Sequence, residues 1–239
     1  MALHAGKVKQ AGGNGKKFAP QEEIEVGNYP SRLAQVIDLG RHYRDKWVDG
    51  QGYVVDTDKP AVGHIMLTYE LTTEFMKDEQ GNDIEDKPRW LSETLPLYSL
   101  DNDKANSTKR YLAFDRVKKY GGDWTELLGH PCTLTIAHSK KGKAKIGSVT
   151  PPMKGLNIPE CKNVPKFFDT TAPDADIFNS LPQWIQDKIR ANLDYEGSEL
   201  QAMIEGKQKA VEEKPVVEKV VGKPAEPVIL EEEGDDEPW

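Results

Sequence analysis

Basic and aromatic side chains are interleaved in one stretch of the sequence, between residues 41 and 53. Lysine and arginine bind phosphate groups, and aromatic rings stack on unpaired bases at about 1 to 3 kcal/mol per base. Both residue types in one segment therefore predict a surface that binds a single strand of nucleic acid. Trp47, which lies among charged residues, is the best candidate for stacking. The candidate residues of this stretch are Arg41, Tyr43, Arg44, Lys46, Trp47 and Tyr53.

A second basic cluster has no acidic residue between positions 138 and 145, and it contains Lys140, Lys141, Lys143 and Lys145. Its lysines surround Gly142 in a predicted tight turn. A charge run that is merely solvated is the alternative for each cluster taken alone. Trp90 is a further candidate, on the mixed face of a predicted strand, where it can either stack on a base or pack under a loop.

Sequence patterns typical of enzymes are missing. The chain has no Gly-rich phosphate loop, no Ser-centred nucleophile elbow and no Cys/His spacing typical of a metal site. Cys132 lies between His130 and His138, and all three are interpreted as bystanders. Glu70 and Glu74 belong to no paired carboxylate motif of a nuclease. We therefore predict no catalytic residue, no metal, no cofactor and no enzymatic activity.

A long strand at residues 64–76 organises the predicted fold, because apolar residues recur there at every second position. A polar turn at 78–83 then predicts a hairpin. The other predicted elements are strands near 33–39, 89–98, 132–137 and 145–149, a helix capped near Asn106, a helical turn at 124–128, and a C-terminal helix at about 180–194 with Ser180 as its N-cap, Pro182 in its first turn, and Trp184, Ile185, Ile189 and Leu193 on one side.

This order of elements is that of an OB-fold, so the predicted class is mainly β: a five-stranded antiparallel barrel with a helix between strands three and four and an extra C-terminal helix. In that fold the ligand crosses strands two and three, flanked by the loops after strands one and four. Here those loops are residues 41–60 and 139–144. Both basic clusters and Trp90 are therefore expected to line one groove.

The 239 residues suit one domain with tails. The predicted parts are a flexible basic arm at 1–28, the OB-fold domain with its C-terminal helix at 29–200, a flexible linker at 201–230 and an acidic tail at 231–239. That tail holds six acids and no base, within a net charge of −8. Such charge asymmetry is typical of a basic binding surface combined with an acidic tail.

The cellular compartment is also predicted from the sequence. No run of eighteen apolar residues is present, so we expect no membrane span and no membrane partner. The N-terminus lacks the apolar core of a signal peptide. Two cysteines, Cys132 and Cys161, are too few for a disulfide framework. We expect a cytoplasmic protein with reduced thiols.

The acidic tail resembles those of bacterial and phage single-stranded DNA-binding proteins, which end in acidic residues followed by an aromatic terminus. Segments 30–40, 87–92 and 107–112 also resemble phage proteins of this kind, over about residues 29–200. The third segment adds Lys109, Arg110 and Tyr111 to the candidate DNA-binding residues. The tail consists of Glu231, Glu232, Glu233, Asp235, Asp236, Glu237, Pro238 and Trp239, with Gly234 between its two acidic runs.

This resemblance implies a protein that coats exposed single-stranded DNA with little sequence preference during phage DNA replication, recombination and repair. It also implies that the tail recruits replication and recombination proteins (a polymerase, helicase-primase, nuclease or annealase) and competes with DNA for the basic groove. The tail departs from the bacterial pattern in ending with Trp239 and in having Glu237 before Pro238, which leaves the partner's identity open. Whether the chain forms a homo-oligomer is also left open. If the chain is phage-encoded, as the resemblance implies, the cytoplasm is that of the host cell.

Two other functions stay open on the sequence. The same barrel can serve as a protein-interaction or assembly module whose basic loops are only solvated. A DNA-processing nuclease is the third hypothesis. Salt-dependent binding to an oligonucleotide separates the first two, and metal-dependent cleavage would identify the third.

Overall fold

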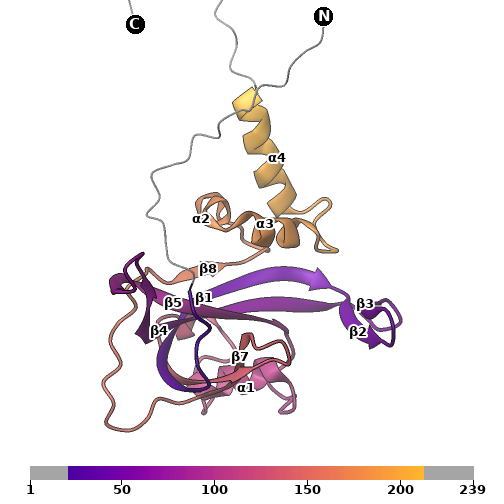
Figure 1. Ribbon diagram of the computed structural model, residues 1–239. Helices are drawn as coiled ribbons and strands as arrows, with labels where there is room; N and C mark the ends of the chain where they lie inside the picture. The colour runs from indigo at the N-terminus through magenta and orange to yellow at the C-terminus, as the bar shows by residue number, and fades with distance from the viewer. Residues whose placement is uncertain (1–20, 213–239) are drawn as a thin grey trace, which may run out of the picture.

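The computed structural model describes residues 21–212, with only the backbone described for residues 207–212. The structure is mainly β, as predicted, with a curved sheet, helices stacked on one side of it and a small hairpin at one end (Figure 1). Its strands are β1 (Gly27–His42), β2 (Arg44–Val48), β3 (Gly52–Asp56), β4 (Val62–Lys77), β5 (Asp83–Pro96), β6 (Pro131–His138), β7 (Ala144–Thr150) and β8 (Lys166–Phe168). Its helices are α1 (Asn106–Phe114), the 3₁₀ turn η1 (Thr125–Leu127), α2 (Ala175–Ser180), α3 (Gln183–Arg190) and α4 (Glu199–Glu212).

The main sheet is centred on β1, in the strand order β5-β4-β1-β6-β7. These neighbours are antiparallel, and the short β8 adds a parallel pairing to β1 at Gln35–Ile37. Register shifts at Leu33/Gln35 and Asp38/Gly40 bulge β1 against β4, and bulges bend a strand. Five of these strands match the predicted ones, with longer bounds. The sequence did not predict β8.

The first core lies on the face of β4 that the period-two pattern marks as apolar. Ile65, Leu67, Tyr69 and Leu71 are all buried, as that pattern predicts. Helix α1 and the η1 turn cover this core from the far side. The buried residues that complete it are Ile24, Leu33, Val36, Leu95, Tyr111, Ala113, Trp124, Leu127, Cys132, Leu134, Ile136 and Val149.

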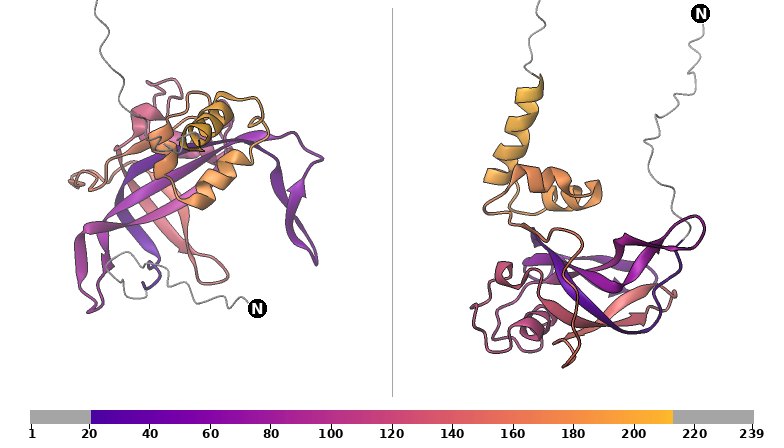
Figure 2. Two further views of the ribbon diagram at one scale, coloured as in Figure 1. Left: turned by 90° about the horizontal axis from the view of Figure 1, so that it is seen from above. Right: turned by 90° about the vertical axis from the view of Figure 1, so that its left-hand side faces the viewer.

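A second core lies on the opposite face of β1 and β4, under helices α2 to α4 (Figure 2). Ile37 and Leu39 of β1 and Met66 of β4 are buried there. Strand β8 supplies Phe168 to this core, and the helical cover supplies Phe178, Leu181, Ile185, Ile189, Leu200 and Ile204. Because β1 and β4 contribute to both cores, this part of the sheet is buried on both faces.

The helix predicted at 180–194 is shorter in the structure, where α3 spans Gln183–Arg190. Ser180 ends α2 and does not cap the next helix, and Pro182 is the N-cap of α3 rather than part of its first turn. Proline has no backbone N–H to donate, which suits it to a helix start. Asp174, whose carboxylate accepts from two backbone N–H groups, caps α2.

Only part of the predicted apolar side of α3 faces the sheet. Ile185 and Ile189 are buried, one helical turn apart, whereas Trp184 is 58% exposed and Leu193, beyond the helix end, is 47% exposed. At 3.6 residues per turn, position 184 lies about 100° away from 185 around the helix. The prediction that all four residues share one side was therefore wrong.

The predicted long loop at 41–60 is mostly an ordered β-hairpin. Strands β2 and β3 pair in register from Arg44↔Asp56 to Val48↔Gly52, around a turn that includes Gly50. This hairpin extends away from the end of the β1–β4 ladder, to one side of the molecule (Figure 1).

The structure describes the last part of the predicted N-terminal arm and the first part of the predicted linker. Of the arm at 1–28, residues 1–20 lie outside the described part. Gln21 exchanges two hydrogen bonds with the Lys77 backbone, and β1 begins at Gly27. Helix α4 occupies the first part of the predicted linker, and the tail at 231–239 lies outside the described residues. In residues 21–212, no helix has the length and apolar character needed to cross a membrane.

Gly40 is expected to be essential for docking α3 onto β1. It has a φ of +78°, and a Cβ there would lie 2.6 Å from Cγ of Asn192, just beyond α3. Gly50 has the same φ of +78°, but nothing lies within 4 Å of its Cβ position. Gly50→Ala should cost about 1 to 2 kcal/mol for the left-handed backbone, and Gly40→Ala should cost more because Asn192 must also move.

Urea unfolding of the two variants and the parent chain tests this difference. Equal losses of unfolding free energy would show that the contact between Gly40 and Asn192 does not hold α3 in place.

Candidate nucleic-acid interface

The β2–β3 hairpin presents an aromatic pair to solvent. Trp47 and Tyr53 are opposite one another in the strand register, 63% and 75% exposed. Their ring centroids are 5.2 Å apart with planes at 77°, an edge-to-face contact. Val55, on the same face of the hairpin because it lies two residues from Tyr53, is 57% exposed. This face therefore offers the exposed rings that the candidate assignment of Trp47 and Tyr53 requires. It also carries two acids, because Asp45 is opposite Val55 in the register and Asp49 accepts from the Trp47 indole N–H.

The opposite face of the hairpin holds a network of charges. Lys46 Nζ lies 2.9 Å from Asp56 and 2.6 Å from Asp58, and Lys59 Nζ lies 3.4 Å from Asp56. Hydrogen bonds to Asp58 and Asp56 raise the pKa of Lys46, and the hydrogen bond from Lys46 lowers the pKa of Asp56. Lys46 thus stabilises the base of the hairpin and is not free to bind a phosphate group.

The other predicted bases of this segment are also engaged. Arg44 donates to the hydroxyl of Tyr98, and Arg41 forms an exposed ion pair with Asp194 at 2.9 Å. Tyr43 is 39% exposed. Residues 41–59 contain four bases and four acids, so the segment has no net charge. The exposed ion pair of Arg41 is weak enough to exchange for a phosphate contact.

Trp90, the candidate on the sheet face, is 40% exposed on β5, and its indole N–H donates to Glu70 of β4. Glu70 is 1% exposed. Its carboxylate also accepts from the backbone N–H groups of Lys162 and Asn163 and from the Asn163 side chain. Trp90 therefore packs beside the segment around residues 162–163, which covers Glu70, and part of its ring stays exposed to solvent.

We call the covering segment, residues 158–163, the strap. Besides its bonds to Glu70, it is held by Arg32 of β1, which donates to the carbonyl groups of Ile158 and Pro159. Arg32 also pairs with Glu160 at 3.0 Å. The predicted ligand path across β4 and β5 is thus blocked over β4, and only the β5 side, with Trp90, is open. No local pattern in the sequence indicates this long-range contact.

Two residues assigned to DNA binding are structural. Arg110 is 7% exposed and forms a forked pair with Glu93 of β5, with its Nε 2.7 Å from Oε1. It also donates to the Gly147 carbonyl of β7 at 3.4 Å. Tyr111 is fully buried against Trp124. Both lie on the sheet-facing side of α1, whereas Lys109 is exposed.

The lysine turn at 139–143 lies beside the start of β1, while the hairpin follows the end of β1. Lys143 pairs with Glu23 at 2.5 Å, and this hydrogen bond and that from the Ala144 N–H lower the pKa of Glu23. Lys140, Lys141 and Lys145 are exposed. The two basic clusters therefore lie at opposite ends of β1. A nucleic-acid strand that touches both must follow the length of the sheet.

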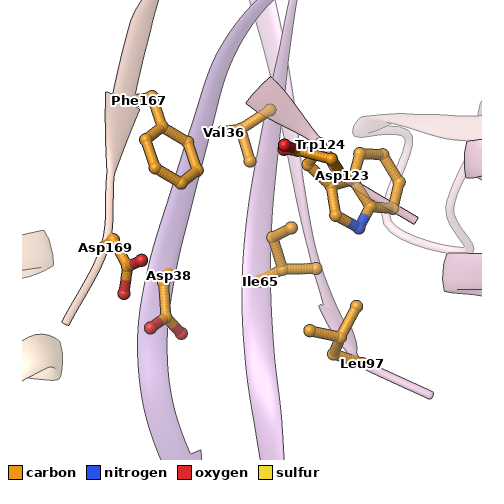
Figure 3. Close-up of a pocket in the computed structure, with 8 residues that line it drawn as sticks. All are labelled: Val36, Asp38, Ile65, Leu97, Asp123, Trp124, Phe167 and Asp169. Carbon is orange, nitrogen blue, oxygen red and sulfur yellow. The ribbon is translucent and has the colours of Figure 1, made fainter. Parts of the chain in front are cut away.

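A small apolar pocket lies between β1, β4, β8 and the η1 turn, with a volume of about 190 Å³ (Figure 3). Asp38 and Asp169 lie side by side at one edge of it, and Asp123 lies next to Trp124 across from them. Three carboxylates around an apolar floor repel phosphate groups. We therefore exclude this pocket from the nucleic-acid surface.

Within residues 21–212 no group of three or more His, Cys, Asp or Glu side chains is arranged to hold a metal ion. Burial raises the pKa of Cys161 to about 11 and that of Cys132 further, so both thiols are protonated at neutral pH. The tail candidates at 231–239 lie outside the described residues.

Comparison of the chain with protein-family models, curated proteins and solved structures finds no match.

Glu70 should hold the strap in place. In Glu70→Ala, at least two strap donors lose a buried acceptor, at a cost of about 1 to 3 kcal/mol each. Urea unfolding should show this loss, and hydrogen exchange at the Lys162 and Asn163 amides should accelerate. Glu74→Ala, on the same strand, is the matched control. If both variants unfold alike and exchange is unchanged, the strap is held by other contacts.

Proposed function

We propose that this chain binds single-stranded DNA with little sequence preference. The observation that carries the proposal is the exposed pair of Trp47 and Tyr53 on an ordered hairpin. An aromatic side chain exposed by more than half costs solvation free energy unless a partner covers it. Every base has a flat π-face, so stacking on such a pair does not depend on the base sequence.

In this proposal, stacking and phosphate binding come from two different regions, because the regions differ in charge. Residues 41–59 have no net charge, so the hairpin's contribution to binding would come from stacking and depend little on salt. Phosphate contacts would come from four exposed lysines: Lys140 and Lys141 on the lysine turn, Lys145 on β7 and Lys109 on α1. The DNA strand would run along the open β5 side, past Trp90, because the strap covers the β4 side.

We further propose that the sheet is an OB-fold barrel with the β2–β3 hairpin inserted between its first and second strands. Strands β1, β4, β5, β6 and β7, with α1 between β5 and β6, follow the element order of that fold. Arg110 supports closure, because it bonds both Glu93 on one edge strand and Gly147 on the other. Binding loops of OB-folds lie where the hairpin and the lysine turn lie in this chain.

The alternative is a protein-interaction module. One observation favours it: the exposed face of the hairpin adds Val55 to the aromatic pair, in a segment without net charge. Protein interfaces are enriched in such aromatic and apolar residues. Under the main proposal, replication and recombination proteins would instead be recruited by the tail, as the resemblance of its sequence implies.

Removing the Trp47 ring should weaken binding without unfolding the chain. Trp47→Ala should cost about 1 to 3 kcal/mol in affinity for an oligo-dT strand. Its melting temperature should change little, because Trp47 is largely exposed. The control is Trp184→Ala, which removes an indole that is 58% exposed on α3. Equal affinities for the two variants, measured by fluorescence anisotropy of a labelled strand, would refute stacking at Trp47.

Removing two lysines should reduce the salt dependence of binding. Lys140→Ala with Lys141→Ala should lower the slope of log K against log salt by about 0.7 for each phosphate that is no longer bound. Affinity should fall alike for all base sequences, because phosphate contacts carry no sequence information. Lys143→Ala should lower the slope less, since Lys143 must first release its exposed ion pair with Glu23. An unchanged slope in the folded double variant would place the phosphate contacts elsewhere.

A further inference from the structure

The small apolar pocket between β1, β4, β8 and the η1 turn repels phosphate groups, but its features suit a cation (Figure 3). Val36 and Ile65, both buried, line its apolar interior. Its volume of about 190 Å³ is below the roughly 300 to 1,000 Å³ of sites for whole small molecules. A second hollow of about 460 Å³ adjoins it, since Leu97 and Trp124 line both. The two hollows together therefore suit one inserted side chain and the backbone next to it.

Three carboxylates lie at the edge of the pocket. Asp38 and Asp169 are side by side, and Asp123 is across from them (Figure 3). None of the three forms an ion pair within residues 21–212. The Oδ1 atom of Asp169 accepts from the backbone N–H and hydroxyl of Thr171, which orients the carboxylate, and its Oδ2 atom has no hydrogen-bond partner in the described chain. The uncompensated negative charge attracts a cation.

Trp124 is an independent observation that points to a ligand. Its side chain is 8% exposed, and its ring packs edge-on against Tyr111. Among the described residues, no acceptor receives a hydrogen bond from its indole N–H. Figure 3 shows the indole nitrogen turned toward Ile65 and Leu97, into the pocket. Because a buried donor without an acceptor is destabilising, a ligand that brings an acceptor to this nitrogen would be favoured.

An arginine residue within a peptide has all the groups that this pocket calls for. Its methylene stem is apolar, and its planar guanidinium has five donors that can bridge neighbouring carboxylates. The guanidinium also stacks on aromatic rings, such as those of Phe167 and Trp124 that line the pocket. The backbone carbonyl next to the side chain is an acceptor for the indole N–H. A lysine ammonium is more strongly hydrated and cannot stack flat on a ring, so it fits less well.

We propose that this pocket binds an arginine side chain of a protein partner. The guanidinium pairs with Asp38 and Asp169, and the adjoining backbone carbonyl accepts from Trp124. Residues 1–20 and 213–239, outside the described part, contain no arginine and do not supply this side chain. The proposal does not depend on single-stranded DNA binding, because no pocket residue belongs to the hairpin, the open β5 side or the lysine turn.

NMR titration of the full chain with Nα-acetylarginine methylamide tests the proposal. The probe should shift the Trp124 indole N–H signal until the site is saturated. The citrulline analogue has the same shape without the charge, and it should bind at least about tenfold more weakly because it loses charge-assisted hydrogen bonds. Propylguanidine is the bare side chain without the carbonyl. It should bind about fivefold more weakly, the effect of losing one neutral hydrogen bond.

A pair of variants locates the site. Asp169→Asn removes one charge and keeps an oxygen for Thr171, and it should weaken binding of the arginine probe about tenfold. Asp86→Asn is the matched control, since it removes a charge from an exposed position near the other end of β5. It should leave the affinity for the probe unchanged. Both variants should unfold at the same urea concentration as the parent chain, because neither removes a buried apolar group.

Several results would overturn the proposal. One is an unmoved Trp124 signal, and another is equal affinity for the arginine and citrulline probes. Equal losses in the two variants would show that net charge and not the pocket attracts the probe. Equal affinity for propylguanidine would assign the pocket to a small free cation and not to a peptide. If dilution of the chain alone moves the Trp124 signal, a second copy fills the pocket, and the assignment to a different protein is wrong.

Discussion

Strand β1 is buried on both faces, and the rest of the structure depends on this constraint. Leu33 and Val36 point into the first core, whereas Ile37 and Leu39 point into the second. Each such side chain contributes about 1.5 to 3 kcal/mol when fully buried. Helices α2 to α4 are therefore needed to cover β1, although they lie far from it in the sequence. The same cover, together with the strap over Glu70, removes most of the outer sheet face from contact with ligands.

Binding surface is consequently left at the periphery: the hairpin, the open side of β5, the lysine turn and the end of α1. These regions differ in charge. Residues 41–59, which contain the hairpin, are aromatic and have no net charge, while the lysine turn and segment 116–119 are basic. In the proposed binding mode, stacking and phosphate contacts are thus separated in space, and a DNA strand would join them by following the sheet.

The sequence predicted those parts of the fold that local patterns determine. The alternation at Ile65 to Leu71 specified β4 and its buried face, and the turn around Gly142 specified the β6–β7 hairpin. The β2–β3 hairpin was not predicted, although Gly50 and Gly52 mark a turn between two short alternating runs, because basic and aromatic residues there also suit a binding loop. The exposure of Trp47 follows from its charged neighbours.

By contrast, the burial of Arg110 depends on Glu93, seventeen residues away, and the position of the strap depends on contacts across more than 90 residues. Neither leaves a periodic signal in the sequence.

Fluorescence titration of the full chain with oligo-dT, at about 50 mM and about 200 mM salt, tests single-stranded DNA binding most directly. We predict saturable quenching of tryptophan fluorescence, because in the proposed binding mode Trp47 would stack on a base. We also predict a lower affinity at the higher salt concentration, because the exposed lysines release counterions from the phosphates. An absence of both quenching and binding at 50 mM salt would contradict single-stranded DNA binding, and the hairpin would then be assigned to a protein partner.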